Sequence, residues 1–93
     1  MMALNQIEVQ KYLKRLNKNW AVIDDKKLRR EFLCKDFRGA IDFVRKVADL
    51  AEAENHHPDI HIFYNKVIVE LWTHAVEGLS EKDFNLVAKI EKL

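Results

Sequence analysis

The chain has 93 residues, a length typical of one domain, expected here over residues 1–93, and its 48% hydrophobic content excludes a disordered chain. Its 16 Lys and Arg nearly balance its 15 Asp and Glu, giving a formal charge of +1, which argues against nucleic acid as a partner. A lone cysteine, Cys34, excludes an internal disulfide. Because the sequence has no run of about 18 apolar residues and no signal-peptide pattern, we expect a cytoplasmic protein without a membrane partner.

A first helix is expected to begin near Asn5, because Asn5 and Glu8 have the spacing of a capping box. Apolar residues recur along it at helical spacing and form one stripe, made of Val9, Tyr12, Leu13 and Leu16. The polar residues 17–19 are expected to end this helix.

Two strands are expected next, over residues 20–24 and 28–34, joined by a polar turn. Leu28, Phe32 and Cys34 are in phase on the second of them. Arg30, between them, belongs to a local basic group that we interpret as a solvated face.

A second helix is expected to begin at the N-cap Asp36 and to run to about Glu54. The residues expected on its buried face are Phe37, Ala40, Ile41, Val44, Ala48 and Ala51.

A β-hairpin is expected from the strand-like runs 59–64 and 67–72, which flank Asn65-Lys66 as a two-residue turn. The pairs expected from this turn are Tyr64–Val67, Ile62–Val69, Ile60–Leu71 and, farther out, His57–His74. The opposite face would carry Phe63, Ile68 and Trp72, an apolar patch that a second subunit or a ligand is expected to cover.

A last helix is expected from Ser80, which forms a variant capping box with Asp83, while Leu79 and Phe84 have the spacing of a hydrophobic staple. Its buried face is expected to contain Phe84, Val87 and Ala88. The order α-β-β-α-β-β-α, with short turns between neighbouring strands, predicts a two-layer α+β domain. A four-stranded antiparallel sheet would carry the helices on one face.

Two adjacent histidines, His56 and His57, stand directly before Pro58. Histidine is the side chain whose unperturbed pKa lies nearest to neutral pH, so the pair suggests proton chemistry, a metal site or a pH switch. The wider pattern comprises Glu52 or Glu54, His56-His57-Pro58, Tyr64-Asn65-Lys66-Val67, Thr73-His74, and Gly78-Leu79-Ser80 through Asp83. In this order and spacing the motifs resemble the pterin-4a-carbinolamine dehydratase family.

The resemblance covers nearly the whole chain, and it includes Trp20 and residues 35–44. The chain departs from the family pattern at Asn19, Ala75 and Glu77, where members often have glycine, an acidic residue and glycine. None of these departures affects the histidines.

The resemblance implies a dehydratase that converts a 4a-hydroxytetrahydropterin into quinonoid dihydropterin and water. The reaction would recycle the pterin after aromatic amino-acid hydroxylation, which makes a hydroxylase a pathway partner. The pterin is the substrate, so neither a metal nor a separate cofactor is expected. The resemblance also implies a homodimer or homotetramer.

By the same resemblance His56, His57 and His74 line the catalytic site. We expect His57 and His74 to transfer the protons at the C4a hydroxyl and His56 to position the substrate or assist, because general acids and bases work best with pKa values near the operating pH. Four further residues are candidates for substrate binding, namely Glu52, Pro58, Asp83 and Trp20.

Each of those four residues also has a structural interpretation. Glu52 could be a solvated residue at a helix end, Pro58 could start a strand, and Asp83 could be a cap alone. Trp20 could belong to the core. His61 lies outside the family pattern and could pair with Glu70 across the hairpin.

Three other functions remain as alternatives. A zinc site is disfavoured because adjacent histidines in a strand point to opposite faces. A binding module is possible, because mammalian relatives also act as dimerisation cofactors of a homeodomain transcription factor. A dehydratase acting on another pterin, such as one of molybdenum cofactor synthesis, is the third.

Overall fold

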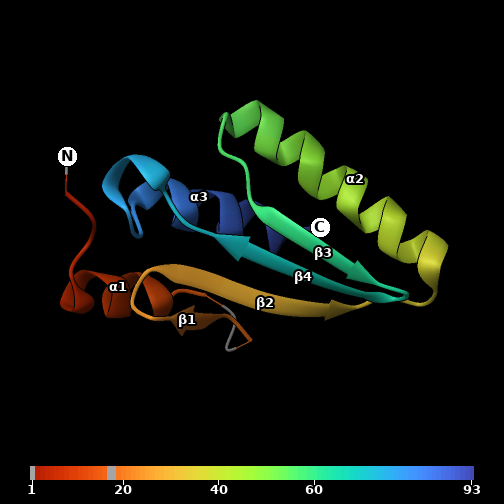
Figure 1. The fold of residues 1–93 in the computed structure, drawn as a ribbon, viewed down its shortest axis with the longest axis horizontal. Coiled ribbons are helices and arrows are strands. Elements are labelled where there is room, and N and C mark those ends of the chain that lie inside the picture. Colours follow the sequence, from red (N-terminus) through yellow and green to blue (C-terminus); the bar gives the residue numbers. More distant parts are fainter. Residues whose placement is uncertain (1, 17–18) are drawn as a thin grey trace.

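The computed structural model describes residues 2–16 and 19–93. The first helix ends at Leu13 and not at the predicted residues 17–19, of which 17 and 18 lie outside the described part. Its elements are α1 (Gln6–Leu13), β1 (Ala21–Ile23), β2 (Lys27–Leu33), α2 (Phe37–Glu54), β3 (Asp59–Phe63), β4 (Lys66–Leu71), the 3-10 helix η1 (His74–Val76) and α3 (Glu81–Ile90). The four strands form an antiparallel sheet in the order β1-β2-β4-β3, and α2 and α3 cover the same face of it (Figure 1). The predicted α+β fold and element order are confirmed, with η1 as an addition.

The predicted helix starts are confirmed by side-chain caps. Asn5 Oδ1 accepts the Glu8 N–H at 2.9 Å, while Glu8 Oε1 accepts the Asn5 N–H at 3.0 Å. Asp36 Oδ1 accepts the Gly39 N–H at 2.7 Å at the start of α2. Each cap satisfies backbone donors that a helix leaves unpaired in its first turn. Within the described ranges, none of the helices has the length and apolar character needed to cross a bilayer.

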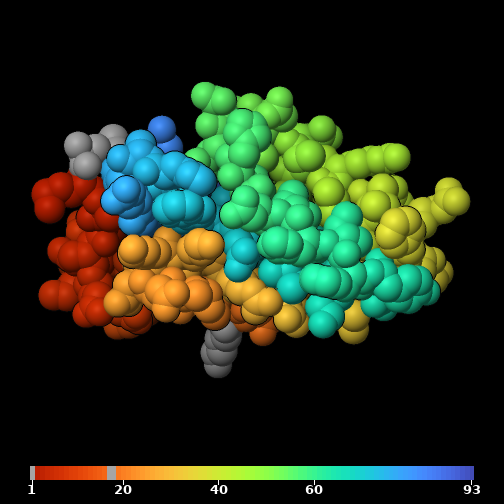
Figure 2. All heavy atoms as spheres, viewed as in Figure 1, coloured from red at the N-terminus to blue at the C-terminus, as the bar shows by residue number. Residues whose placement is uncertain are grey.

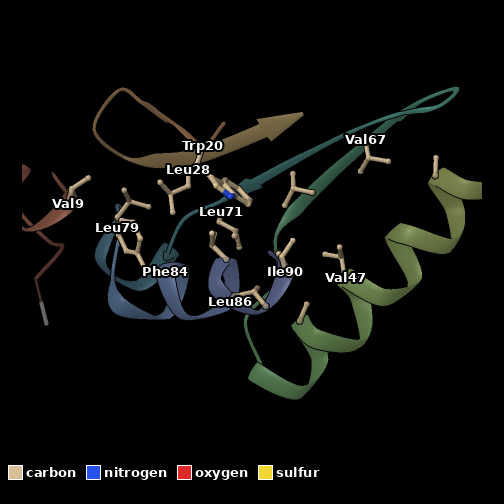
Figure 3. Packing of buried hydrophobic residues seen from close by; sticks show 14 residues of the cluster. Val9, Trp20, Leu28, Val47, Val67, Leu71, Leu79, Phe84, Leu86 and Ile90 are labelled. Carbon is tan, nitrogen blue, oxygen red and sulfur yellow. The ribbon is translucent and has the colours of Figure 1, made fainter. Parts of the chain in front are cut away.

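The core lies between the sheet and the two helices (Figure 3). Its fully buried side chains come from β2 and β4 on one side and from α2 and α3 on the other, and they include Leu28, Val67, Val69, Leu71, Val47, Leu86 and Val87. At one end, Tyr12 of α1 stacks on Phe84 with ring centroids 5.0 Å apart and donates a hydrogen bond to Glu81 Oε1 at 2.8 Å. That hydrogen bond raises the pKa of Tyr12 above its ordinary value.

The buried face of α2 differs from the predicted one by a rotation of the helix. Ala40 and Ala51 are buried as expected, but the third buried residue is Val47. Phe37 is 53% exposed, and Ala48 is exposed as well. Ala88 of α3 is also exposed, whereas Phe84 and Val87 are buried. Because the apolar face of α2 is broader than the stripe that packs on the sheet, the sequence pattern alone does not select that stripe.

Arg30 does not lie on a solvated face, contrary to the prediction. It alternates with Leu28 and Phe32 on the helix-covered side of β2, and its guanidinium carbon lies 4.4 Å from the Phe32 ring centroid and 5.9 Å from that of Trp20. An arginine can take such a place because its flat, weakly hydrated head stacks on aromatic rings.

The hairpin turn is Tyr64-Asn65 rather than the predicted Asn65-Lys66. The observed register pairs Phe63 with Lys66, Ile62 with Val67 and Ile60 with Val69, two residues away from the predicted one. The Asn65 C=O accepts the Cys34 N–H at 2.7 Å, and the Asn65 amide donates to the Cys34 C=O at 3.2 Å. These bonds extend the β2–β4 ladder into the turn. A shift of two residues keeps every side chain on its predicted face but removes the predicted His57–His74 pairing.

The corrected turn can be tested with two glycine substitutions. Tyr64 has a φ of 54° and is 67% exposed, so Tyr64→Gly should stabilise the protein by about 0.5–1 kcal/mol, because a left-handed residue with a Cβ costs about 1–2 kcal/mol. Lys66→Gly should destabilise it by about 0.5–1 kcal/mol, since Lys66 pairs within the sheet. Urea unfolding measures both. A destabilised Tyr64→Gly variant together with a stabilised Lys66→Gly variant would support the Asn65-Lys66 turn instead.

Candidate functional site

Two chain connections leave the hairpin at the end opposite its turn. β3 begins at Asp59, which pairs with Glu70, and β4 ends one residue later at Leu71. Residues 55–58 and 72–80 therefore emerge from the same end of adjacent strands, as Figure 1 shows. The three histidines of the predicted site all lie on these two connections.

A buried carboxylate, Asp83, connects the two segments. Asp83 is fully buried, and its Oδ2 accepts the Ser80 N–H at 2.9 Å and the Thr73 hydroxyl at 2.8 Å. Its other oxygen, Oδ1, lies 2.5 Å from His56 Nε2. The Thr73 and Ser80 hydroxyls are themselves 2.7 Å apart. The predicted capping box of Ser80 and Asp83 is confirmed, and the same carboxylate also contacts a predicted site histidine.

The end of α2 determines where His56 lies. Asn55 takes a left-handed conformation with φ 50° and ψ 43°, which asparagine tolerates better than most residues. The Asn55 N–H then donates to the Glu52 C=O at 3.2 Å and the His56 N–H to the Ala51 C=O at 3.0 Å. The His56 side chain is 11% exposed. An ionised carboxylate can only accept hydrogen bonds, so in the contact with Asp83 the donor is His56 Nε2. The other ring nitrogen, Nδ1, takes no part in this contact.

His57 lies on the outer side of the same turn. Its Nε2 forms an ion-pair contact with Glu52 Oε2, and its side chain is 59% exposed. Of the two acidic candidates, Glu52 is thus the one beside a histidine, whereas Glu54 accepts from Lys89 Nζ at 2.6 Å. Pro58 is half-buried and directly precedes β3, in agreement with its structural interpretation as a strand start.

His74 is presented by a tight loop. Thr73 and Gly78 form an isolated β-bridge, with the Thr73 N–H donating to the Gly78 C=O at 2.8 Å, and η1 fills the loop between them. Glu77 has a φ of 51°, which explains why glycine is favourable at this position. His74 is exposed, and its ring centroid lies 4.0 Å from that of Trp72.

The other predicted residues lie elsewhere. Trp20 is 4% exposed and packs in the core with Phe32, as its structural interpretation expects. His61 Nε2 lies 3.3 Å from Glu70 Oε1. Both residues are on the sheet face without helices, which is the face shown in Figure 2. On that face Ile68 is only 8% exposed and Trp72 is half-buried, so Phe63, which is 59% exposed, is the one exposed member of the predicted patch. Among residues 2–16 and 19–93, no three His, Cys, Asp or Glu side chains gather as a metal-binding group.

Two residues of the site were not predicted, Thr73 as the donor to Asp83 and Trp72 as the ring beside His74. Thr73 directly precedes His74 within the Thr73-His74 motif, and Trp72 directly precedes that motif. The one signal in the sequence was that both residues stand close to a candidate histidine. Thr73 contacts Asp83, ten residues away, and Trp72 contacts His74 because of the conformation of the loop, so neither contact follows from the sequence.

Comparison with known proteins identifies similar chains. A family profile described as "Pterin 4 alpha carbinolamine dehydratase" matches residues 2–93. A protein of Alkaliphilus metalliredigens, provisionally named a pterin-4-alpha-carbinolamine dehydratase, is 42% identical over 89 residues, which cover 96% of this chain and 80% of that protein. The Arabidopsis thaliana protein "Pterin-4-alpha-carbinolamine dehydratase 2, mitochondrial" is 51% identical over 71 residues, which cover 75% of this chain and 38% of that protein.

A solved structure has the same fold. The "transcriptional coactivator/pterin dehydratase" from Brucella melitensis superposes with a TM-score of 0.90 at 33% sequence identity. The match covers 97% of this chain and 96% of that chain.

The buried network predicts a marked effect of Thr73→Val, a change of nearly constant volume. The variant removes a donor from buried Asp83 and the partner of the Ser80 hydroxyl, so unfolding free energy should fall by about 1–3 kcal/mol. Urea unfolding measures the change. As a control, Glu54→Gln weakens a partly exposed ion pair to Lys89 and should cost less than about 1 kcal/mol. A Thr73→Val effect no larger than that of the control would contradict the network.

Proposed function

The chain belongs to the pterin-4a-carbinolamine dehydratase family, and from this premise we propose that it removes water from a 4a-hydroxytetrahydropterin. The product is quinonoid dihydropterin, and the reaction serves the recycling of tetrahydrobiopterin. The pterin is the substrate, and the chemistry uses no metal and no separate cofactor.

The proposed reaction needs two proton transfers. The C4a–O bond breaks, and the oxygen leaves as water after a general acid has protonated it. A general base takes a proton from a ring N–H, and the electron pair released forms the new C=N double bond. The step involves no net oxidation or reduction. Correctly placed acids and bases each accelerate such transfers by about 10²–10⁴-fold.

The surroundings of the three histidines support different roles. His57 and His74 are exposed, so a substrate can reach their rings, and we assign to them the transfers at the C4a hydroxyl and the ring nitrogen. His56 is nearly buried and its Nε2 is held by Asp83, which suits a group that positions the substrate through Nδ1.

The acidic candidates act through the histidines in this proposal. Glu52 contacts His57 and would hold its ring in place. Asp83 orients His56 and has no exposed surface with which to contact a substrate directly. Pro58 would shape the turn that carries both histidines, and Trp20 would contribute through the core.

The observation that carries the proposal is the arrangement at one end of the β3–β4 hairpin. Two exposed imidazoles lie on connections that a buried carboxylate ties together, and a third imidazole is bonded to that carboxylate. A fold that used these residues for stability alone would have no need of the exposed pair.

A second role, self-association or partner binding, is supported by a separate observation. Phe37 at the start of α2 is 53% exposed and lines a shallow hollow with Arg38, Ile41, Asp42 and Arg45. An apolar ring among charged side chains is typical of an interface core with a polar rim. We propose a homodimer or homotetramer, which can exist together with dehydratase activity.

The dehydratase is tested by generating a 4a-hydroxytetrahydropterin in situ and following quinonoid dihydropterin by absorbance. We expect sub-stoichiometric protein to accelerate its formation over the uncatalysed rate. His57→Ala and His74→Ala should each lower kcat by about 10²–10⁴-fold, because each removes a proton-transferring group. His61→Ala is the matched control, since His61 is an exposed histidine outside the site, and it should keep wild-type activity.

Two outcomes would contradict the proposal. A folded wild-type chain that leaves the uncatalysed rate unchanged would exclude this substrate and favour another pterin or a binding role. Near-wild-type turnover in both His57→Ala and His74→Ala would exclude the assignment of the proton transfers.

A further inference from the structure

Trp72 is the residue that follows β4, and its indole contacts His74. The two ring centroids are 4.0 Å apart with an angle of 38° between the ring planes. Thr73 between them has an extended conformation, with φ −108° and ψ 107°, so the side chains at 72 and 74 point to the same side of the chain. Trp72 is half-buried and His74 is exposed.

The indole is in turn held by the neighbouring strand. Lys27 opposes Trp72 one residue beyond the Leu28–Leu71 pair of β2 and β4, and its Nζ lies 5.6 Å from the Trp72 ring centroid. A cation over an indole within about 6 Å is attracted by the ring quadrupole. The Trp72 side chain therefore has a partner on β2 as well as in the loop.

Without the indole, His74 would be an exposed side chain on a short loop, and its ring could occupy several rotamers. A proton transfer requires that the ring be oriented toward the reacting atom, and a misplacement of about 1 Å can lower the rate by about 10²-fold. The flat face of Trp72 at van der Waals distance excludes part of that rotational freedom.

The geometry points to Trp72 as a positioning residue for His74, an inference that rests on the proposed dehydratase function. Trp72 holds the His74 imidazole in the orientation needed for proton transfer, and Lys27 holds Trp72. Trp72 itself is not a catalytic residue, because it acts through His74.

The test combines NMR with steady-state kinetics on three variants. Trp72→Leu keeps an apolar side chain but removes the ring, Trp72→Phe keeps a flat ring, and His61→Ala removes an exposed ring from the helix-free sheet face as a control. Thermal unfolding verifies that each variant is folded. In the wild type, the indole ring current should displace the His74 ring-proton resonances, and Trp72→Leu should abolish this displacement while Trp72→Phe keeps most of it.

The kinetic expectation separates positioning from substrate binding. Trp72→Leu should lower kcat by about 10–10²-fold with little change in KM, and Trp72→Phe should restore most of the activity. His61→Ala should change neither. A raised KM with unchanged kcat would overturn the inference, because it would make Trp72 a substrate-binding residue.

Two further outcomes distinguish the failures. An active wild type with an equally active, folded Trp72→Leu variant would overturn this inference alone. A wild type without dehydratase activity would overturn the proposed function and the catalytic part of this inference, while undisplaced His74 resonances would overturn the ring contact itself.

Discussion

The rest of the structure depends on the buried carboxylate of Asp83. A charge without access to water is tolerated only where hydrogen-bond donors surround it, and here they come from three places in the chain. Ser80 supplies a backbone N–H at the start of α3, Thr73 a hydroxyl at the end of β4, and His56 a ring nitrogen beyond α2. One side chain thus fixes the relative positions of the two connections that carry all the candidate histidines. The same contact that caps a helix assembles the site.

Much of the fold could be predicted because its signals are local. The caps at Asn5, Asp36 and Ser80 depend on residues two or three positions apart, and strand alternation correctly divided β3 and β4 into an inner and an outer face. The hairpin register could not be predicted in this way. It depends on bonds between Asn65 and Cys34, the residue that follows β2, and a local turn preference carries no information about β2. The same holds for α2, whose buried stripe is selected by the sheet against which it packs.

The sequence named the candidate residues of the site but not their geometry. The order of the motifs led to His56, His57 and His74 through a family resemblance, yet the predicted cross-strand pairing of His57 with His74 was wrong. Capping rules correctly explained Asp83, and because a cap is a sufficient reason for an aspartate, they gave no indication that its second oxygen reaches His56. A single sequence does not show which side chains on different helices and strands will contact one another, so this part of the site's geometry could not be predicted. Glu77 is a further example, since its left-handed φ became visible only in the folded loop.

The most direct test of this account is the protonation of His56, read from a long-range proton–nitrogen NMR spectrum of the ¹⁵N-labelled protein. Because Asp83 already accepts two hydrogen bonds and an ionised carboxylate cannot donate, the account predicts a proton on His56 Nε2. This leaves Nδ1 for the site. A neutral ring with its proton on Nδ1 and a bare Nε2 would contradict it, because Asp83 would then have to be the donor and could not be the charged group around which the two connections assemble.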